Sequence, residues 1–180
     1  MRCSRCLLQH CLCAEIPTVT TQTRIVIVRH HLEVFRASNT GRLAHFALPN
    51  SEIVEHGGAL GSARLPALEG MWLLFPEGPV AEAPIAPPPR ALVVLDATWS
   101  QARRMYRKLE ALRGLPILRL PDAPMPAARL RESPAPGKVS TIEAIARALR
   151  LLEGDAAAAP LERLFELAVV RMAQSGRQMR

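Results

Sequence analysis

Four stretches of apolar residues predict the strands of a buried sheet. Residues 24 to 29 enclose a continuous β-branched run, which is typical of a strand covered on both faces. Residues 71 to 75 form a second run that stops at Pro76, and residues 91 to 95 form a third that ends at Asp96. Residues 115 to 120 predict a fourth strand.

Cap residues predict helices between these strands. Ser38-Asn39-Thr40-Gly41 offers caps for a short helix over residues 42 to 48, and residues 98 to 112 have a helical composition. Residues 76 to 90 are proline-rich, which predicts a loop or a rigid connector.

The last part of the chain is predicted to be helical. Ser140-Thr141-Ile142-Glu143 is a capping box, and apolar residues recur after it at helical spacing, so we expect a helix to about Glu153. Pro160 suits the first turn of a final amphipathic helix that ends at Ala173.

Alternating strands and helices predict an α/β fold with a mostly parallel sheet flanked by helices. Ligands bind such sheets beyond the carboxyl ends of the strands. Two segments lie at those ends, namely Phe75-Pro76 and Asp96-Ala97-Thr98-Trp99. These segments are therefore the first places to look for a functional site.

Composition limits the class of protein. The chain has 180 residues, of which 49% are apolar, and this fits one domain or a domain with a small appendage. No apolar run approaches the length of about 20 residues that a membrane-spanning helix needs. The first residues lack the pattern of a secretory signal, so we expect a cytoplasmic protein with no membrane span.

The charge balance favours a polyanionic partner. The formal net charge is +7, and the basic side chains are nearly all arginine, whose planar fork pairs with phosphate. Codon bias toward Arg, Ala, Pro and Gly is an equally good explanation. Aromatic residues make up 4% of the chain, so contacts with nucleic acid would depend on phosphates and shape more than on stacked bases.

All four cysteines lie near the start of the chain, in the pattern C-x2-C-x4-C-x-C at Cys3, Cys6, Cys11 and Cys13. In a reducing compartment, four thiolates supply the tetrahedral shell that zinc prefers. Two disulfides or four free thiols are the alternatives. We expect a zinc-binding segment over residues 1–16 and a catalytic domain over residues 17–180.

Asp96 stands where a strand becomes a helix. One interpretation makes Asp96 or Thr98 a helix cap and Trp99 a core anchor. The other places a reactive carboxylate beside a basic helix, because Arg103, Arg104, Arg107 and Lys108 follow within it. A solvated charged face would also explain these cations.

The motif Asp96-Ala97-Thr98-Trp99 resembles the D-x-T-W signature of the DTW-domain proteins, the tRNA-uridine aminocarboxypropyltransferases. The resemblance covers about the first 150 residues, because further motifs of that family follow in the same order. They are the opening cysteines, His30-His31-Leu32-Glu33, Ser38-Asn39-Thr40-Gly41-Arg42-Leu43, Leu74-Phe75-Pro76, Gln101-Ala102-Arg103, Leu130-Arg131 and Ser140-Thr141-Ile142-Glu143-Ala144.

This resemblance implies transfer of the 3-amino-3-carboxypropyl group from S-adenosylmethionine, the co-substrate, to N3 of a uridine in tRNA, the partner, with release of methylthioadenosine. It also implies a SPOUT-like sheet with a C-terminal trefoil knot. The oligomeric state stays open. A SAM-dependent RNA methyltransferase and a non-catalytic zinc-containing RNA-binding protein are the alternatives.

The resemblance assigns roles to particular residues. The catalytic set is Asp96, Thr98 and Trp99, with Asp96 either accepting the N3 proton or orienting the reactants. The cofactor-binding set is Asn39, Thr40, Leu74, Phe75, Pro76, Trp99, Leu118 and Thr141, although helix capping and core packing would explain several of these. Glu33 either binds the cofactor ammonium or is a surface residue. The expected RNA contacts are Arg103, Arg104, Arg107, Lys108, Arg131 and Lys138.

Overall fold

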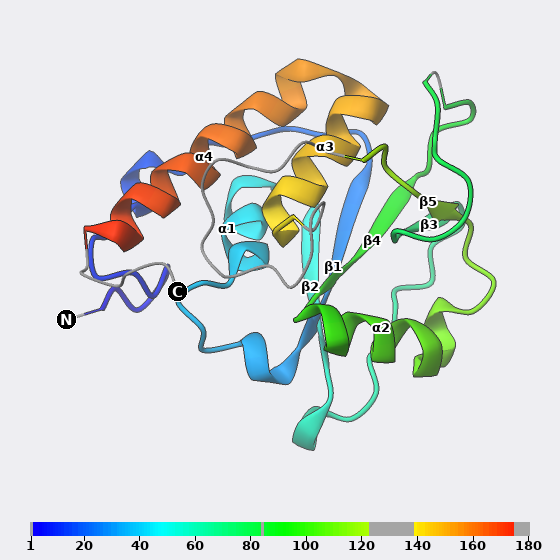
Figure 1. The fold of residues 1–180 in the computed structure, drawn as a ribbon, viewed down its shortest axis with the longest axis horizontal. Helices are drawn as coiled ribbons and strands as arrows, with labels where there is room; N and C mark the ends of the chain where they lie inside the picture. The colour runs from blue at the N-terminus through cyan, green and yellow to red at the C-terminus, as the bar shows by residue number, and fades with distance from the viewer. Residues whose placement is uncertain (1, 84, 123–138, 175–180) are drawn as a thin grey trace.

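The computed structural model describes residues 2–83, 85–122 and 139–174. Its centre is a parallel sheet of five strands in the order β2-β1-β4-β3-β5 (Figure 1). The strands are β1 (Arg24–His30), β2 (Ser51–His56), β3 (Met71–Leu74), β4 (Ala91–Asp96) and β5 (Ile117–Leu118). The predicted α/β fold with a parallel sheet is confirmed.

Helices cover both faces of this sheet, as Figure 1 shows. One face carries α1 (Thr40–Ala47), α3 (Thr141–Glu153) and α4 (Asp155–Ala173), and the other carries α2 (Trp99–Lys108). Alternation along β1 produces this arrangement, because Ile25 and Ile27 join the core under α1 and α3 while Val26 and Val28 join the core under α2. The continuous apolar run is thus explained by burial on both faces.

The structure differs from the prediction at three elements, of which one, β2, has no predicted counterpart. Strand β2 was not expected, because its six residues are all half-buried at the sheet edge and show no apolar run. The helix expected to run to residue 112 ends at Lys108, and a short 3-10 turn, η4 (Glu110–Leu112), follows it. Leu109 and Leu112 are both buried in the core. The fourth strand is only the two residues of β5.

The prediction for Pro160 is wrong in position. Helix α4 begins at Asp155, so Pro160 lies inside the helix and not in its first turn. A proline there removes one backbone hydrogen bond, which would be to the carbonyl of Ala156 four residues earlier. Four consecutive alanines precede Pro160, and their helix-forming tendency favours the earlier start.

The connections that follow β1 and β4 lead toward opposite edges of the sheet. From β1 the chain passes through α1 on one face to the neighbouring β2, whereas from β4 it passes through α2 on the other face toward β5. In open α/β sheets, ligands bind beyond the carboxyl ends of the strands at such a switch point. Asp96 ends β4 there, and Arg29 of β1 lies opposite it in the strand register.

The N-terminal segment packs on the same core as the helices. Cys6, Leu8 and Leu12 are buried with Leu161 and Phe165 of α4. The domain boundary at residue 16 and the C-terminal knot remain predictions. Among the described residues, no helix has the length and apolar character needed to cross a membrane.

Candidate active site and metal centre

The carboxylate of Asp96 joins the first turns of two helices. The side-chain amide of Asn39, the N-cap of α1, donates a hydrogen bond to Oδ2, and the Thr141 hydroxyl at the start of α3 donates to Oδ1 at 2.7 Å. Thr40 links the same helices, since its hydroxyl oxygen accepts the backbone N–H of Ile142 at 3.3 Å. Four residues predicted separately along the sequence therefore form one cluster.

This carboxylate is buried, with 3% of Asp96 exposed. Burial raises the pKa of Asp96 above its usual value, while the hydrogen bonds from Asn39 and Thr141 and the nearby charge of Arg29 act in the opposite direction. The net direction is upward. Asp96 is consequently a stronger proton acceptor, once ionised, than an ordinary aspartate.

Gly41 lies against this carboxylate. A Cβ atom on Gly41 would lie 2.6 Å from the carboxyl carbon of Asp96, which is closer than real Cβ contacts allow. The glycine therefore makes room for the acid. In the sequence it is one member of a cap segment and of a family motif, and its role depends on a contact that local patterns do not reveal.

Thr98 and Trp99 are placed by the start of α2. Thr98 is the N-cap. Its hydroxyl oxygen accepts the backbone N–H of Gln101 at 3.4 Å, and its own backbone N–H donates to Gln101 Oε1 at 2.8 Å, which together form a capping box. Trp99 is the first residue of the helix and is half-buried. The capping interpretation of Thr98 is confirmed, and it is compatible with a second role.

The strand-end residues of the predicted cofactor-binding set divide between the two faces of the sheet. Leu74 and Leu118 are paired in the register of β3 and β5 and are buried in the core below α1 and α3, on the side of Asp96. The ring of Phe75 lies on the other side and stacks on Tyr106 of α2 at 4.1 Å between centroids. Pro76 is exposed.

The cations predicted on α2 share its outer surface. Arg103, Arg104, Arg107 and Lys108 are all exposed, while Ala102 and Met105 face the core. The other two predicted RNA contacts, Arg131 and Lys138, lie outside the described residues.

Three further charged residues lie near this edge, and the sequence assigns a possible role to one of them, Glu33, as a ligand of the cofactor ammonium. Arg29 pairs with Glu55 of β2, and the buried guanidinium of Arg42 donates to the carbonyl oxygens of Val34 and Arg36. Glu33 is 1% exposed, so its interpretation as a surface residue is wrong. Parallel pairing and the alternation of strand side chains put Arg29 on the face of Asp96, but the strand register could not be predicted.

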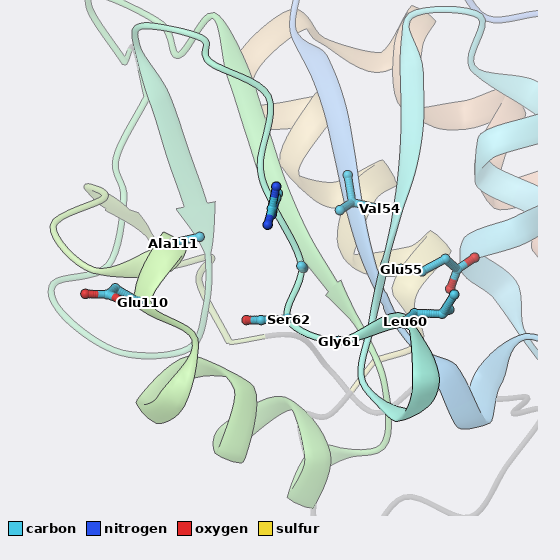
Figure 2. Close-up of a pocket in the computed structure, with 9 residues that line it drawn as sticks. Val54, Glu55, Leu60, Gly61, Ser62, Glu110 and Ala111 are labelled. Carbon is cyan, nitrogen blue, oxygen red and sulfur yellow. The ribbon is translucent and has the colours of Figure 1, made fainter.

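A separate cavity of about 700 Å³ lies beside the edge strand β2 (Figure 2). It is lined by the end of β2, the turn after it and η4, with Val54, Glu55, residues 60 to 64, Glu110 and Ala111. The lining contains none of the predicted cofactor-binding residues.

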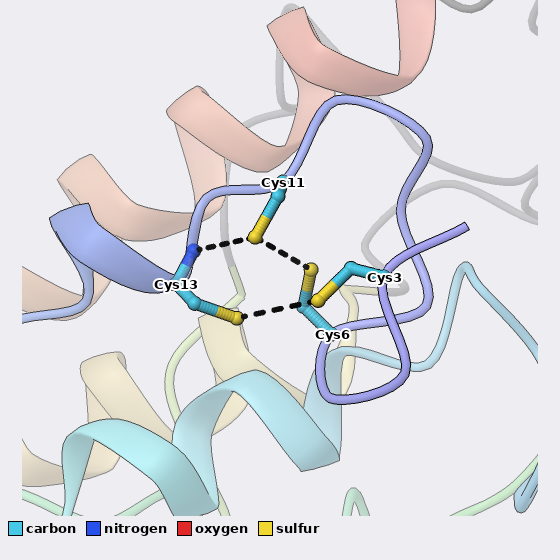
Figure 3. Close-up of side chains that lie close together, drawn as sticks. All are labelled: Cys3, Cys6, Cys11 and Cys13. Atoms are coloured by element: carbon cyan, nitrogen blue, oxygen red, sulfur yellow. Dashed lines mark hydrogen bonds between the residues drawn. The ribbon is translucent and has the colours of Figure 1, made fainter. Parts of the chain in front are cut away.

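The four cysteines converge at one point (Figure 3). Their Sγ atoms all lie within 4.8 Å of one another, with Cys3 and Cys13 at 3.8 Å and Cys6 and Cys11 at 3.9 Å. Four sulfur atoms at about 2.3 Å from one zinc ion stand about 3.8 Å apart in a tetrahedron. No disulfide joins them. The donor set and its spacing therefore fit a metal such as zinc.

Ionisation of this cluster also favours a cation. Hydrogen bonds from the backbone N–H groups of Cys6 and Arg5 lower the pKa of Cys3 to about 6, whereas burial and the neighbouring thiols raise the pKa of Cys13 to about 12. Several adjacent thiolates repel one another unless a positive charge lies between them. A bound divalent cation supplies that charge.

Comparison with known proteins gives relatives along most of the chain. It is 30% identical over 183 aligned residues to tRNA-uridine aminocarboxypropyltransferase A of Arabidopsis thaliana, covering 81% of this chain and 69% of that protein. It is 27% identical to tRNA-uridine aminocarboxypropyltransferase 2 of Drosophila melanogaster, covering 79% of this chain and 62% of the relative. For the Macaca fascicularis protein of that name the identity is 27%, covering 84% and 56%.

The chain thus spans between 56% and 69% of the length of these relatives. No solved structure matches it significantly. The profile of the DTW domain family matches residues 1–173, which is nearly the whole chain. On this evidence, the protein belongs to the DTW domain family.

Proposed function

We propose that this chain is an enzyme that transfers the 3-amino-3-carboxypropyl group from S-adenosylmethionine to N3 of a uridine in tRNA. The observation that carries the proposal is the buried Asp96 carboxylate at the switch point between β1 and β4, tied to the starts of α1 and α3. The names of the relatives support tRNA as the substrate.

The polar groups around Asp96 suit the donor. A carboxylate attracts a sulfonium cation, and the first turns of α1 and α3 favour the carboxylate of an amino acid. When bound, S-adenosylmethionine supplies a carbon already activated by its sulfonium leaving group. Positioning by the protein is then the main requirement, and Asn39, Thr40 and Thr141 are the residues that we assign to it.

Asp96 is our candidate for the proton acceptor. Uridine N3 must lose its proton as the new N–C bond forms and the C–S bond of the donor breaks. Each oxygen of Asp96 accepts one hydrogen bond and keeps a further lone pair. The carboxylate is almost covered, and our proposal places the uridine beside it, at the carboxyl ends of β1 and β4. Trp99 is proposed to close the site beside the sulfonium, where the face of its ring favours a cation.

The proposal also includes the cations of α2 and the cysteine cluster. The exposed cations of α2 are assigned to tRNA phosphates, and the cysteine cluster is assigned to one zinc ion with a structural role. We place the reaction in the cytoplasm, on a SPOUT-like scaffold.

The test separates the possible reactions by isotope. The purified protein is incubated with tRNA and with S-adenosylmethionine labelled either in the carboxyl group or in the methyl group. We expect only the carboxyl label to enter RNA, and we expect Asp96→Asn to abolish its entry while tRNA still binds. Methyl label alone would identify a methyltransferase. Binding of tRNA with neither label would identify a non-catalytic RNA-binding protein.

A further inference from the structure

The connection between β1 and α1 exposes two apolar side chains. Phe35 is 84% exposed and Leu32 is 52% exposed, which makes Phe35 the most exposed large apolar residue that the structure describes. Both belong to the segment from His31 to Asn39, which leaves the carboxyl end of β1 and ends at the cap of α1. The ring therefore stands at the edge of the sheet that holds Asp96.

A buried charge fixes the backbone on both sides of this ring. The guanidinium of Arg42, a residue that is 7% exposed, donates to the carbonyl oxygens of Val34 and Arg36, the two neighbours of Phe35. Glu33 is buried beside them, and its carboxylate lies 3.5 Å from Nε of Arg36. Burying a guanidinium is unfavourable unless it is hydrogen-bonded, and here those bonds fix a loop that displays an aromatic ring.

The surroundings of the ring are basic. Asn39, at the end of the segment, donates to Asp96, so the segment borders the candidate active site. Arg36, the residue that follows Phe35, is exposed, with 48% of its side chain accessible. Helix α2, which carries exposed cations, begins directly after β4 at the same carboxyl end of the sheet. A ring face among cations is the combination that binds nucleic acid, because cations contact phosphates and the ring stacks on a base.

We propose that Phe35 is a stacking platform for an unpaired base of the RNA substrate, next to the nucleotide that is modified. This inference rests on the proposed function, whose substrate it describes in more detail. The low aromatic content of the chain does not oppose it, since one ring suffices where the backbone holds it in place. The ring contributes binding of the substrate and takes no part in the chemical step.

The test compares Phe35→Ala with Phe35→Trp. Because the ring is exposed, both variants should fold as the unchanged protein does, which circular dichroism checks. Loss of one stacking contact is expected to raise the Kd and the KM for tRNA about 10-fold, with kcat nearly unchanged. The slope of log Kd against log salt should stay the same, because no phosphate contact is lost. Phe35→Trp should restore binding, and its added indole fluorescence should be quenched by RNA.

Val170→Ala is the matched control, since Val170 is an apolar residue of α4 that is 51% exposed. It should leave tRNA binding unchanged. Equal Kd and KM for Phe35→Ala and the unchanged protein would overturn the inference while leaving the proposed function intact. Loss of self-association in Phe35→Ala, with tRNA binding unaltered, would also overturn it and would identify a contact between copies of the chain. If no group is transferred but RNA binding still depends on the ring, the proposed function fails and the stacking role stands.

Discussion

Burial and hydrogen bonds act in opposite directions on the pKa of Asp96. Burial raises its pKa, and the Thr141 hydroxyl is one of the donors that opposes this. Thr141 is the first residue of α3, while Ser140 is its cap, so Thr141→Val removes the hydroxyl and leaves the cap intact. We expect a further rise in the pKa of Asp96, and the acid side of the pH profile of kcat/KM should move to higher pH.

The same substitution predicts a change in stability with pH. A carboxyl group with a raised pKa stabilises the fold while it is protonated. Its contribution is complete below a pH of about 3.9, the pKa of an aspartate in the unfolded chain, and is lost as the pH rises through the folded-state pKa. Urea unfolding at several pH values should therefore show a larger loss between acid and neutral pH in Thr141→Val. Thr21→Val is the control, because the buried Thr21 hydroxyl donates to Thr23 and not to Asp96. An unmoved pH profile in Thr141→Val would contradict this account of the site.

The contact between Gly41 and Asp96 makes a second prediction. Helix propensity alone would let Gly41→Ala stabilise α1 by about 1 kcal/mol. Because the new Cβ would lie 2.6 Å from the carboxyl carbon, we expect instead a loss of about 1 to 3 kcal/mol in the free energy of unfolding, and loss of activity. In an Asp96→Ala background the same change should cost less. Equal costs in both backgrounds would show that the two residues do not interact.

Residues of the site differ in how far the sequence predicts them. Cap patterns mark Asn39 and Thr141, and the end of an apolar run marks Asp96. These are local signals, and the family resemblance assigns the three residues to one site. Gly41 and Arg29 act through contacts across the sheet and between helices, which depend on the register of β1 and β4. Their roles could be recognised only once those elements were placed.

At the level of elements, burial explains which predictions were confirmed. The strands at the centre of the sheet and helix α3 carry strong apolar patterns, and they form where expected. Strand β2 lies at the edge and all six of its residues are half-buried, so its apolar pattern is weak. Helix α4 begins before Pro160 because packing on α3 and the N-terminal segment outweighs one lost hydrogen bond.

A metal ion in the N-terminal segment would stabilise the fold. We expect one zinc ion per chain, held by the four cysteines, in protein purified under reducing conditions. At free zinc about 1,000 times the Kd, binding stabilises the fold by about 4 kcal/mol, and a chelator should remove that stability. Thermal unfolding of the unchanged protein and of Cys11→Ser, with and without chelator, checks this. Equal melting temperatures with and without chelator in the unchanged protein would exclude a structural metal.

The whole molecule carries a formal charge of +7, and part of that charge lies on the outer surface of α2. If those cations contact tRNA phosphates, Arg104→Gln and Arg107→Gln should each reduce the salt slope of binding by about 0.7 to 0.9. Arg163→Gln is the control, because Arg163 is exposed on α4 at the other face of the sheet. Equal reductions at all three positions would mean that binding follows net charge alone and that α2 is not the contact surface.

In the proposed reaction, a carbon chain of S-adenosylmethionine is joined to uridine N3 beside Asp96. Mass spectrometry of nucleosides tests it most directly, using tRNA incubated with that donor and either the unchanged protein or Asp96→Asn. We predict uridine carrying a 3-amino-3-carboxypropyl group on N3 with the unchanged protein and none with the variant. A methylated nucleoside, or equal product from the two proteins, would contradict the account.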